Sequence, residues 1–330
     1  MIEIADLDLT DEGAVRVYFE VEQAAQRADR PDAVLRTWPQ LQQMLLQPSP
    51  YHTRQSLVAR EEGRVVGTAE LALPQQDNPH LAGLQVNVLQ ETRRRGIGRE
   101  LHDEAVRRAR AERRTTLLGE VFTPVDGAMS AGLAFAGALG FEVAHQEDHQ
   151  SLRLPLPRTR LAGLPVGVEG YEILTWGPRC PDDLVEAYAE MHTRMGQDAP
   201  SGDIDFQPAT FDVARIREGE ERTANAYQQI AAAARRTSDG VFGGYTLVYL
   251  PHGEDYVVQD DTLVMPDHRG HGLGMALKSR VLRILAEEHP DRTVIHTWNG
   301  TANEPMLRIN RELGFRPVER ELEMQRRDQL

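Results

Sequence analysis

Apolar residues in the first half of the chain form short alternating or continuous segments separated by glycine, a pattern typical of strands and turns. Leu101, Ala105 and Ala109 instead recur at the spacing of one helix face. Gly140 follows a second helix-compatible segment and is well suited to end it. Together these patterns predict strands at residues 55–60, 64–73, 81–89 and 115–122, and helices at residues 98–112 and 128–139.

The second half of the chain repeats this order of patterns. It predicts strands at residues 242–250, 256–264 and 293–298, and helices at residues 274–288 and 304–313. Residues 227–235 contain an alanine run with high helix propensity, yet they align with the first-half strand at residues 54–60. We expect a strand there, because tertiary context routinely overrides intrinsic propensity.

Two short motifs show that the halves are copies of one domain. Arg-x-x-Gly-x-Gly occurs at residues 93–98 and 269–274, and Leu-Gly-Phe follows at residues 139–141 and 313–315. A spacing this long excludes a solenoid and indicates a duplicated domain. Prolines and glycines concentrate between the copies, as in a linker. We therefore expect an N-terminal domain at residues 1–155, a linker at residues 156–169 and a C-terminal domain at residues 170–330.

Composition narrows the function classes. No apolar run approaches the roughly 18 residues of a membrane span, and the acidic N-terminus does not resemble a secretory signal. Cys180 is the only cysteine, which excludes internal disulfides and thiolate zinc clusters. A net charge of −14 makes nucleic acid an improbable partner and is compatible with a cationic small molecule. These features predict a cytoplasmic enzyme or binding protein, and they do not indicate an oligomeric state.

The glycine motif follows a predicted strand and opens a predicted helix in both copies. Glycines allow unusual backbone angles, and the first turn of a helix presents unpaired N–H donors, so such a loop can bind a pyrophosphate. A tight turn that uses glycine only for geometry is the alternative, and the duplication weakens it. A Walker A loop is excluded because the only lysine lies in Leu277-Lys278-Ser279. A dinucleotide fingerprint is excluded because neither loop has the third glycine.

The combination of Arg-x-x-Gly-x-Gly after a strand and a later Leu-Gly-Phe resembles the GCN5-related N-acetyltransferase (GNAT) superfamily, over nearly the whole chain. The resemblance implies an α+β fold of two tandem domains, each a mixed, splayed β-sheet flanked by helices. It implies acetyl-CoA as the acyl donor and no metal. It also implies cofactor-binding residues in the strand end and loop of each copy, with one residue further on: Val88, Leu89, Arg93, Arg94, Arg95, Gly96, Ile97 and Gly98, then Val264, Met265, Arg269, Gly270, His271, Gly272, Leu273, Gly274 and Asn303.

The two copies differ on the catalytic side. In the resembled family, a carboxylate near the strand before the loop often serves as the base. Asp260 and Asp261 occupy that strand in the second copy, where the alternative is a solvated strand edge, while Gln85 aligns with Asp261 in the first. Glu70 on the neighbouring strand is the fallback base of the first copy.

The final helix differs from the family pattern in both copies. Many members carry an asparagine eleven residues before the glycine of Leu-Gly-Phe and a tyrosine four residues before it. Asn303 supplies the asparagine in the second copy, and Met129 replaces it in the first. Ala136 and Asn310 replace the tyrosine, so the usual general acid is absent from both copies.

Two further groups of residues allow more than one interpretation. His268 and His271 flank the second loop, and without nearby cysteines or paired carboxylates they predict polar loop residues near a phosphate, not metal ligands. Lys278 lies one turn beyond Gly274 and predicts either a contact to a CoA phosphate or a surface lysine.

We therefore expect an N-acetyltransferase that acts on a primary amine of a small molecule by direct attack. Asp261 and Asp260 of the second copy are the catalytic candidates, and the first copy is expected to be catalytically degenerate. The alternative is a CoA-binding, sensing or scaffold protein of the same fold that performs no turnover.

Overall fold

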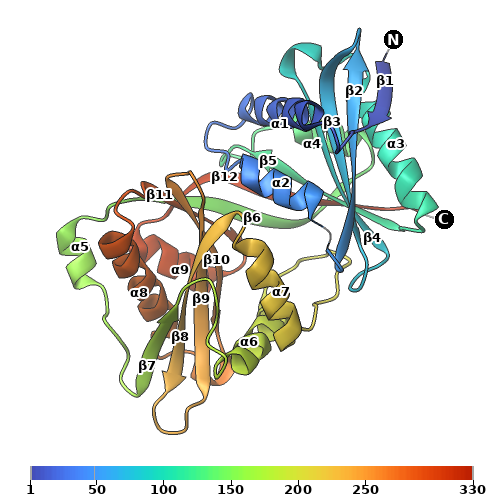
Figure 1. Cartoon of the computed structure of the whole chain (residues 1–330). Helices are drawn as coiled ribbons and strands as arrows, with labels where there is room; N and C mark the ends of the chain where they lie inside the picture. The colour runs from blue at the N-terminus through green and yellow to red at the C-terminus, as the bar shows by residue number, and fades with distance from the viewer. Residues whose placement is uncertain (1, 48, 329–330) are drawn as a thin grey trace. The chain divides into compact units, whose positions relative to one another are not determined.

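The apolar segments of the first half fold into a mixed sheet covered by helices on both faces (Figure 1). The computed structural model describes residues 2–47 and 49–328. Their contacts divide the chain into two units. Unit 1 takes in the described residues of Met1–Gln146, Ser201–Gln207 and Glu319–Leu330, and unit 2 takes in Glu147–Pro200 and Pro208–Val318.

Unit 1 contains strands in the order β1-β2-β3-β4-β5-β12, in which β4 and β5 are parallel and the other described pairs are antiparallel. Its helices α1 and α2 pack on one face, and α3 and α4 pack on the other. The bounds are β1 Ile2–Asp6, α1 Glu12–Arg27, α2 Trp38–Leu46, β2 His52–Glu61, β3 Arg64–Pro74, β4 Leu81–Val88, η1 Gln90–Thr92, α3 Ile97–Ala111, β5 Thr116–Thr123, α4 Ala131–Ala138 and β12 Arg316–Arg327.

Unit 2 repeats this architecture with the order β7-β8-β9-β10-β11-β6, in which β10 and β11 are parallel. Helices α6 and α7 cover one face, and α8 and α9 cover the other. The bounds are β6 Glu142–Arg153, α5 Arg158–Gly163, β7 Tyr171–Trp176, α6 Val185–Asp198, α7 Val213–Thr223, β8 Tyr227–Arg236, β9 Phe242–Pro251, β10 Tyr256–Val264, η2 Pro266–His268, α8 Leu273–Glu288, β11 Val294–Gly300 and α9 Glu304–Leu313.

The alanine-rich segment forms strand β8, which confirms that its context overrides its helix propensity. Ala231, Ala232, Ala233 and Ala234 are all fully buried between β7 and β9. Such a strand is buried on both faces, and small side chains let helices approach it from either side.

The two units do not coincide with the expected domains, because each sheet is completed by the last strand of the other copy. Residues 147–153 of β6 pair with β11 in unit 2, and residues 320–327 of β12 pair with β5 in unit 1. The expected linker at residues 156–169 contains α5, whose Leu161 packs on the core of unit 2. Strand periodicity indicates that a strand exists but does not identify its neighbour.

Both sheets are splayed, as the resemblance implies. The described pairing of β4 with β5 covers only Leu81–Gly83 and Thr116–Leu118. The pairing of β10 with β11 covers only Tyr256–Gln259 and Val294–Thr297. Beyond these residues each pair of parallel strands separates, immediately before the glycine loop that follows β4 or β10.

Candidate functional site

The two glycine loops adopt the same backbone shape. Gly96 has φ +91° at the start of α3, and Gly272 has φ +80° at the start of α8. Two residues earlier, Arg94 has φ +64° and Gly270 has φ +81°. Neither helix has a side-chain cap, so the N–H groups of both first turns remain available to a ligand. The positive end of the helix dipole adds to the attraction for an anion.

The motif arginines fasten the loops to their own units. Arg93 Nε donates to the carbonyl oxygen of Val88 at 3.1 Å, and Arg269 Nε donates to that of Val264 at the same distance. Each guanidinium also pairs with an aspartate, Arg93 with Asp29 at 2.6 Å and Arg269 with Asp198 at 2.7 Å. The sequence predicted that both arginines bind the cofactor. In the structure, their side chains instead bond the loop to the end of the preceding strand and to an aspartate of the same unit.

The other predicted loop residues divide by exposure. Arg94, Arg95 and His271 are exposed, and Arg95 pairs with Glu61 at 2.8 Å. Ile97 and Leu273 are buried in the cores of their units, so only their backbone can face a ligand.

The ends of the strands are already partly bonded. Val88 and Val264 are partly exposed. The N–H groups of Leu89 and Met265 donate to carbonyl oxygens of the neighbouring strands β3 and β9.

The second glycine of each loop serves packing. A Cβ at Gly98 would lie 3.2 Å from the ring of Phe135 in α4, and one at Gly274 would lie 3.0 Å from Ile309 in α9. A Cβ at Gly96 or Gly272 would meet nothing within 4 Å. Asn303 caps the N-terminus of α9 by accepting from the N–H of Met306, and it has this structural role whatever else it contacts.

A β-bulge places the predicted catalytic carboxylates where β10 leaves β11. The ladder between β9 and β10 shifts by one residue between Gln259 and Thr262, so Asp260 and Asp261 lie in the bulge. The Gln259 side chain is buried, and its Nε2 donates to the carbonyl oxygens of Leu247 at 2.8 Å and Asp261 at 3.2 Å. This amide satisfies the backbone groups that the bulge leaves without ladder partners.

Asp261 belongs to a polar cluster built from three elements. Tyr245 of β9 is fully buried and donates its hydroxyl to Asp261 Oδ2 at 2.5 Å. His192 of α6 lies with Nδ1 3.6 Å from the same oxygen and 3.3 Å from the Tyr245 hydroxyl. Burial lowers the pKa of His192, and burial together with the Asp261 charge raises the pKa of Tyr245 well above its ordinary value. Sequence reasoning missed His192, because a lone histidine in a helix of this kind carries no motif.

Asp260 makes no ion pair among the described residues, and its carboxyl accepts a hydrogen bond from the backbone N–H of Asp261. Its side chain reaches solvent, although protein surrounds it on most sides. This partial loss of hydration and the negative charge of Asp261 raise the pKa of the Asp260 carboxyl above its ordinary value. The bulge therefore holds one carboxyl fixed by a tyrosine hydroxyl and one without a side-chain partner among the described residues.

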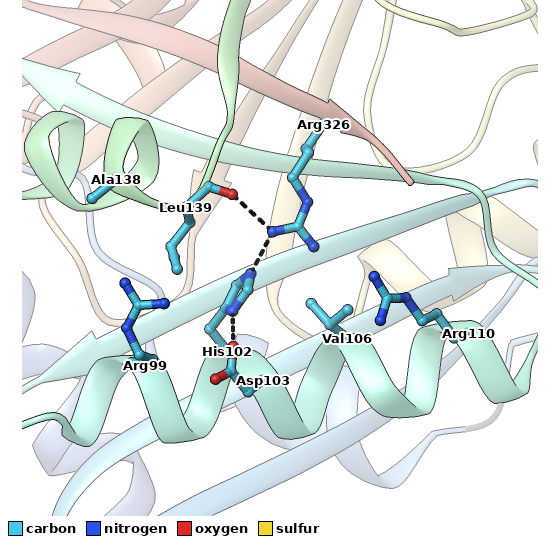
Figure 2. Close-up of a pocket in the computed structure, with 8 residues that line it drawn as sticks. All are labelled: Arg99, His102, Asp103, Val106, Arg110, Ala138, Leu139 and Arg326. Atoms are coloured by element: carbon cyan, nitrogen blue, oxygen red, sulfur yellow. Dashed lines mark hydrogen bonds and ion pairs between the residues drawn. The ribbon is translucent and has the colours of Figure 1, made fainter. Parts of the chain in front are cut away.

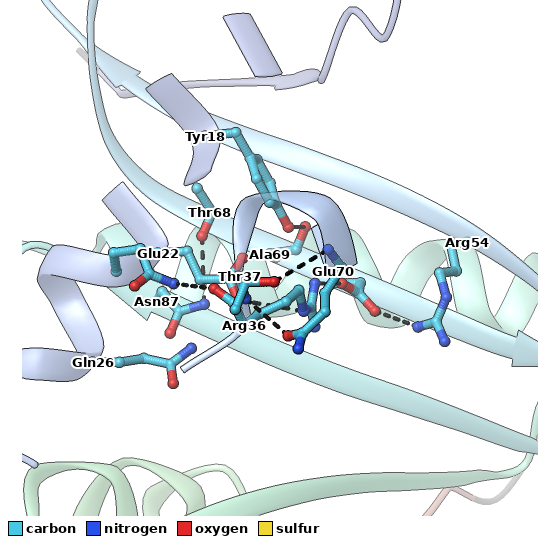
Figure 3. Close-up of polar contacts among 12 residues, drawn as sticks. Tyr18, Glu22, Gln26, Arg36, Thr37, Arg54, Thr68, Ala69, Glu70 and Asn87 are labelled. Carbon is cyan, nitrogen blue, oxygen red and sulfur yellow. Dashed lines mark hydrogen bonds and ion pairs between the residues drawn. The ribbon is translucent and has the colours of Figure 1, made fainter. Parts of the chain in front are cut away.

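The first copy lacks this arrangement. Its β3–β4 ladder runs without a bulge from Gly67↔Val88 to Ala72↔Gly83, and Gln85 lies opposite Glu70. Figure 3 shows Glu70 held by two guanidinium groups, Arg36 at 2.9 Å and Arg54. Both carboxylate oxygens of Glu70 are therefore already engaged by side chains, which argues against Glu70 as the fallback.

Lys278 fits neither of its two predicted roles. It is 2% exposed, and its Nζ donates to Asn310 Oδ1 at 2.8 Å. Asn310, which occupies the place of the family tyrosine, donates in turn to Gln150 at 2.9 Å and Asn299 at 2.6 Å. Burial alone lowers the pKa of Lys278 to about 7. The residue is an interior lysine of unit 2, not a surface or phosphate-contacting one.

A separate pocket of about 340 Å³ lies between α3, the end of α4 and Arg326 of β12 in unit 1 (Figure 2). Arg326 crosses it, donating to His102 Nε2 at 3.1 Å and to the Leu139 carbonyl oxygen at 2.9 Å. His102 Nδ1 lies 2.7 Å from Asp103 Oδ1. These polar groups are largely engaged with one another. The pocket is lined by Arg99, His102, Asp103, Val106, Arg110, Ala138, Leu139 and Arg326.

Within the described residues, no group of three or more His, Cys, Asp or Glu side chains is placed to hold a metal ion. His268, one of the two loop histidines, is buried and shares a hydrogen bond of 2.8 Å with the Tyr171 hydroxyl. Among all the residues that the structure describes, no helix is both long enough and apolar enough to cross a bilayer.

Comparison with known proteins agrees with this geometry. The model of the acetyltransferase (GNAT) family matches residues 14–141. A solved structure described as a tandem GNAT protein from the clavulanic acid biosynthesis pathway, without AcCoA, is 28% identical, with a TM-score of 0.85, 99% of this chain covered and 98% of that one. A GCN5-related N-acetyltransferase from Sphaerobacter thermophilus is similar in fold, with 14% identity, a TM-score of 0.71, and 99% and 95% covered. The search of curated proteins found no match.

Proposed function

We propose that this chain, which belongs to the GCN5-related N-acetyltransferase superfamily as a tandem member, transfers an acetyl group from acetyl-CoA to a primary amine of a small molecule. One observation carries the proposal. In unit 2, an uncapped helix with a glycine loop, a pair of separating strands and a bulge with two carboxyls all meet at the end of β10.

The donor side relies on backbone groups. We place the CoA pyrophosphate on the N–H groups between Gly270 and Gly274, where positive φ angles turn successive amides toward one point. The pantetheine arm would lie along residues 260–264, whose edge no longer pairs with β11. Unit 1 has the same loop and the same separation, so we expect a second donor site at Gly96 and Gly98.

The acceptor side relies on carboxylates. A small-molecule amine arrives as an ammonium ion, and Asp261 accepts a proton from its nitrogen, directly or through water. The Tyr245 hydroxyl fixes the orientation of Asp261. Asp260, which has no side-chain partner among the described residues, attracts the cation. Bound acetyl-CoA supplies the thioester carbon that the amine nitrogen attacks directly and a thiolate that leaves readily, since its pKa is about 8.5.

Several finer assignments follow from this proposal. Unit 2 is the catalytic unit, because among the described residues the bulge with two adjacent carboxyls occurs in its β9–β10 ladder and not in the β3–β4 ladder of unit 1. We expect the reaction to occur in the cytoplasm and to need no metal, and we expect neither nucleic acid nor a membrane as a partner.

Calorimetry with acetyl-CoA tests the donor site. Gly272→Glu should abolish binding to unit 2, because the carboxylate repels the pyrophosphate where nothing else fills the space. Gly96→Glu should remove the second binding event in the same way. Gly253→Glu is the matched control, since Gly253 has φ +78° and open space in the β9–β10 turn, away from the loop. Unchanged affinity in Gly272→Glu would remove the basis of the proposal.

Turnover across a panel of small primary amines tests the acceptor site. A positioned base contributes typically 10²–10⁴-fold, so Asp261→Asn should slow turnover by at least about tenfold, while acetyl-CoA affinity stays nearly constant. Gln85→Ala in unit 1 is the matched control and should leave the rate unchanged. Acetyl-CoA binding without transfer to any amine of the panel would instead favour a CoA-binding protein without turnover.

A further inference from the structure

The loop between α6 and α7 of unit 2 has its middle part in unit 1. Helix α6 ends at Asp198 and α7 begins at Val213, both in unit 2, whereas the contacts of Ser201–Gln207 group this segment with unit 1. Loops of this length without a helix or strand are uncommon in compact domains and usually have a function. We call residues 199–212 the strap.

Side chains of unit 1 hold the backbone of the strap by paired hydrogen bonds. Asn78 is 8% exposed; its Nδ2 donates to the carbonyl oxygen of Gln207 at 2.9 Å, and its Oδ1 accepts from the Gln207 N–H at 2.7 Å. Gln325 of β12 accepts from the N–H of Asp205 at 2.7 Å and donates to the carbonyl oxygen of Asp203 at 3.2 Å. Each amide therefore satisfies one backbone donor and one backbone acceptor of the strap.

Two further features fit this part of the strap to unit 1. The Asp205 carboxylate accepts from the Thr116 hydroxyl at 3.1 Å, and the Asp205 carbonyl oxygen lies 3.1 Å from His80 Nε2. Gly202 has φ +56°, and a Cβ at this position would overlap with the carbonyl oxygen of Ala144. The turn of the strap therefore requires glycine, both for its backbone angle and for its close approach to unit 1.

In unit 2 the strap leads directly to the polar cluster around Asp261. The Phe211 N–H donates to Thr193 Oγ1 of α6 at 2.9 Å, and the ring centroids of Phe211 and His192 lie 5.4 Å apart. His192 Nδ1 in turn lies 3.6 Å from Asp261 Oδ2. The end of the strap thus contacts a side chain that faces the predicted catalytic carboxylate.

Phe211 is the part of the surroundings of His192 that can move with the strap. Tyr188 belongs to α6 and Tyr245 to β9, and their ring centroids lie 4.4 Å and 4.8 Å from that of His192. Phe211 instead lies in irregular chain between the segment attached to unit 1 and the start of α7. Burial lowers the pKa of His192, although the charge of Asp261 opposes this effect. Release of the strap would therefore expose His192 to water and leave the helices in place.

We propose that Asn78 and Gln325 of unit 1 are positioning residues for the chemistry of unit 2, because they hold the strap that keeps Phe211 against His192 and His192 beside Asp261. This inference rests on the proposed function, since it concerns the acceptor side of the same site. Unit 1 then supports acetyl transfer in unit 2 without a contact to the substrate, whether or not unit 1 binds acetyl-CoA itself.

The donor side of unit 2 should respond less to the strap. Asp198, which pairs with Arg269 of the glycine loop, is the last residue of α6. Arg194, one turn earlier in the same helix, holds the other carboxylate oxygen of Asp198 at 2.8 Å. Detachment of Ser201–Gln207 from unit 1 should therefore loosen Phe211 more than Asp198.

The experiment uses the full chain with Asn78→Gly. Asn78 has φ +54°, which glycine adopts without strain, so the change removes the amide and keeps the backbone. Glu62→Gly is the matched control, because Glu62 is an exposed residue of unit 1 with φ +52° between β2 and β3. Amide exchange in residues 205–212 should accelerate at least about tenfold in Asn78→Gly, because local opening no longer breaks the hydrogen bonds of Asn78. It should not change in the control.

An NMR titration of the His192 imidazole provides the second measurement, with the resonance assigned from a His192→Gln chain. The pKa of His192 should rise toward its ordinary value in Asn78→Gly, because loss of the Phe211 contact restores hydration. Gly202→Ala should have the same effect by an independent route, since its Cβ meets the Ala144 carbonyl oxygen. Circular dichroism checks that both chains fold.

Acetyl transfer provides the third measurement. For an amine that the parent chain acetylates, Asn78→Gly should lower kcat/KM at least about tenfold, because a misplacement of about 1 Å can cost about 10²-fold. The affinity for acetyl-CoA should stay within about threefold. Unchanged kcat/KM in an active chain, exchange that accelerates only at residues 205–207, or a His192 titration that both variants leave unchanged would overturn the proposal. If the parent acetylates no amine, the proposed function fails, while exchange and titration still decide whether Asn78 positions His192.

Discussion

Replacing Lys278 by methionine should remove a pH dependence of folding stability that the buried amine imposes. The side chain is 2% exposed, its one described polar contact is Asn310, and the ring of Phe315 lies 5.6 Å from Nζ. Burial lowers the pKa of Lys278 from 10.5 to about 7. Between these two values the unfolded chain binds a proton that the folded chain does not, so stability rises with pH.

The size of this effect follows from the shift. The penalty for Lys278 is complete below the folded pKa of about 7 and disappears above the unfolded value of 10.5. At about 1.4 kcal/mol per pKa unit, the whole penalty is about 5 kcal/mol. About 2 to 3 kcal/mol of it falls between about pH 7.5 and pH 9.5, a range in which the chain can be handled.

Urea unfolding of the parent and Lys278→Met chains at these two pH values provides the assay. Other titrating groups cancel in the difference between the chains. Methionine also leaves Asn310 Oδ1 without its donor, which costs about 1–3 kcal/mol at either pH and does not affect the slope. Relative to Lys278→Met, the parent should gain about 2 to 3 kcal/mol in the free energy of unfolding from the lower to the higher pH.

Arg280→Met on the same helix is the control and should show no such slope, because a guanidinium stays charged in both states. A difference between the parent and Lys278→Met that does not change with pH would refute the reasoning. It would mean that Lys278 stays protonated inside unit 2, with the cost of burying its charge offset by interactions other than the described contacts.

Two further outcomes are expected from the same structure. Tyr245→Phe removes the hydroxyl that donates to Asp261 at 2.5 Å but keeps the carboxylate, so turnover should stay within about tenfold of the parent rate. The pH–rate profile of the parent chain should show no falling limb below about pH 9.5. A falling alkaline limb in the parent chain that Tyr245→Phe abolishes would identify Tyr245 as a general acid. Leu322→Ala in β12 should destabilise unit 1 by about 2–5 kcal/mol, because Leu322 is 6% exposed and packs with Leu117 of β5. Amide exchange that accelerates in β10 and β11 instead of β5 would contradict this placement of the last strand.

Local patterns predict most of the elements, because apolar periodicity and glycine positions act over a few residues. The helix expected at residues 98–112 forms as Ile97–Ala111, and the strand expected at residues 256–264 forms as Tyr256–Val264. The alignment of the copies identified β8 correctly where propensity pointed to a helix. The positive φ angles at Gly96 and Gly272 agree with the conformational freedom for which we expected glycine there.

Features that depend on distant residues could not be predicted in this way. The exchange of β6 and β12 is a choice of neighbouring strand, which the periodicity along a single strand does not specify. The bulge at Asp260 and Asp261 changes a ladder register by one residue without a sequence signal of its own. Lys278 was expected either to contact a CoA phosphate or to lie at the surface, and its burial was missed because it depends on Asn310 and Gln150, which lie far away in the sequence.

The comparison of the two copies shows which parts of such a site can be matched by aligning their sequences. The loops use backbone groups, so Arg94 and Gly270 adopt the same left-handed conformation although their side chains differ. The acidic side uses side chains, and these can come from any element that reaches the gap between the parallel strands. Aligning Gln85 with Asp261 therefore indicates a loss in the first copy. In unit 1 the carboxylate opposite Gln85 is Glu70 of β3, and Arg36 and Arg54 engage both of its oxygens, so the first copy keeps the loop without a bulge carboxyl beside it.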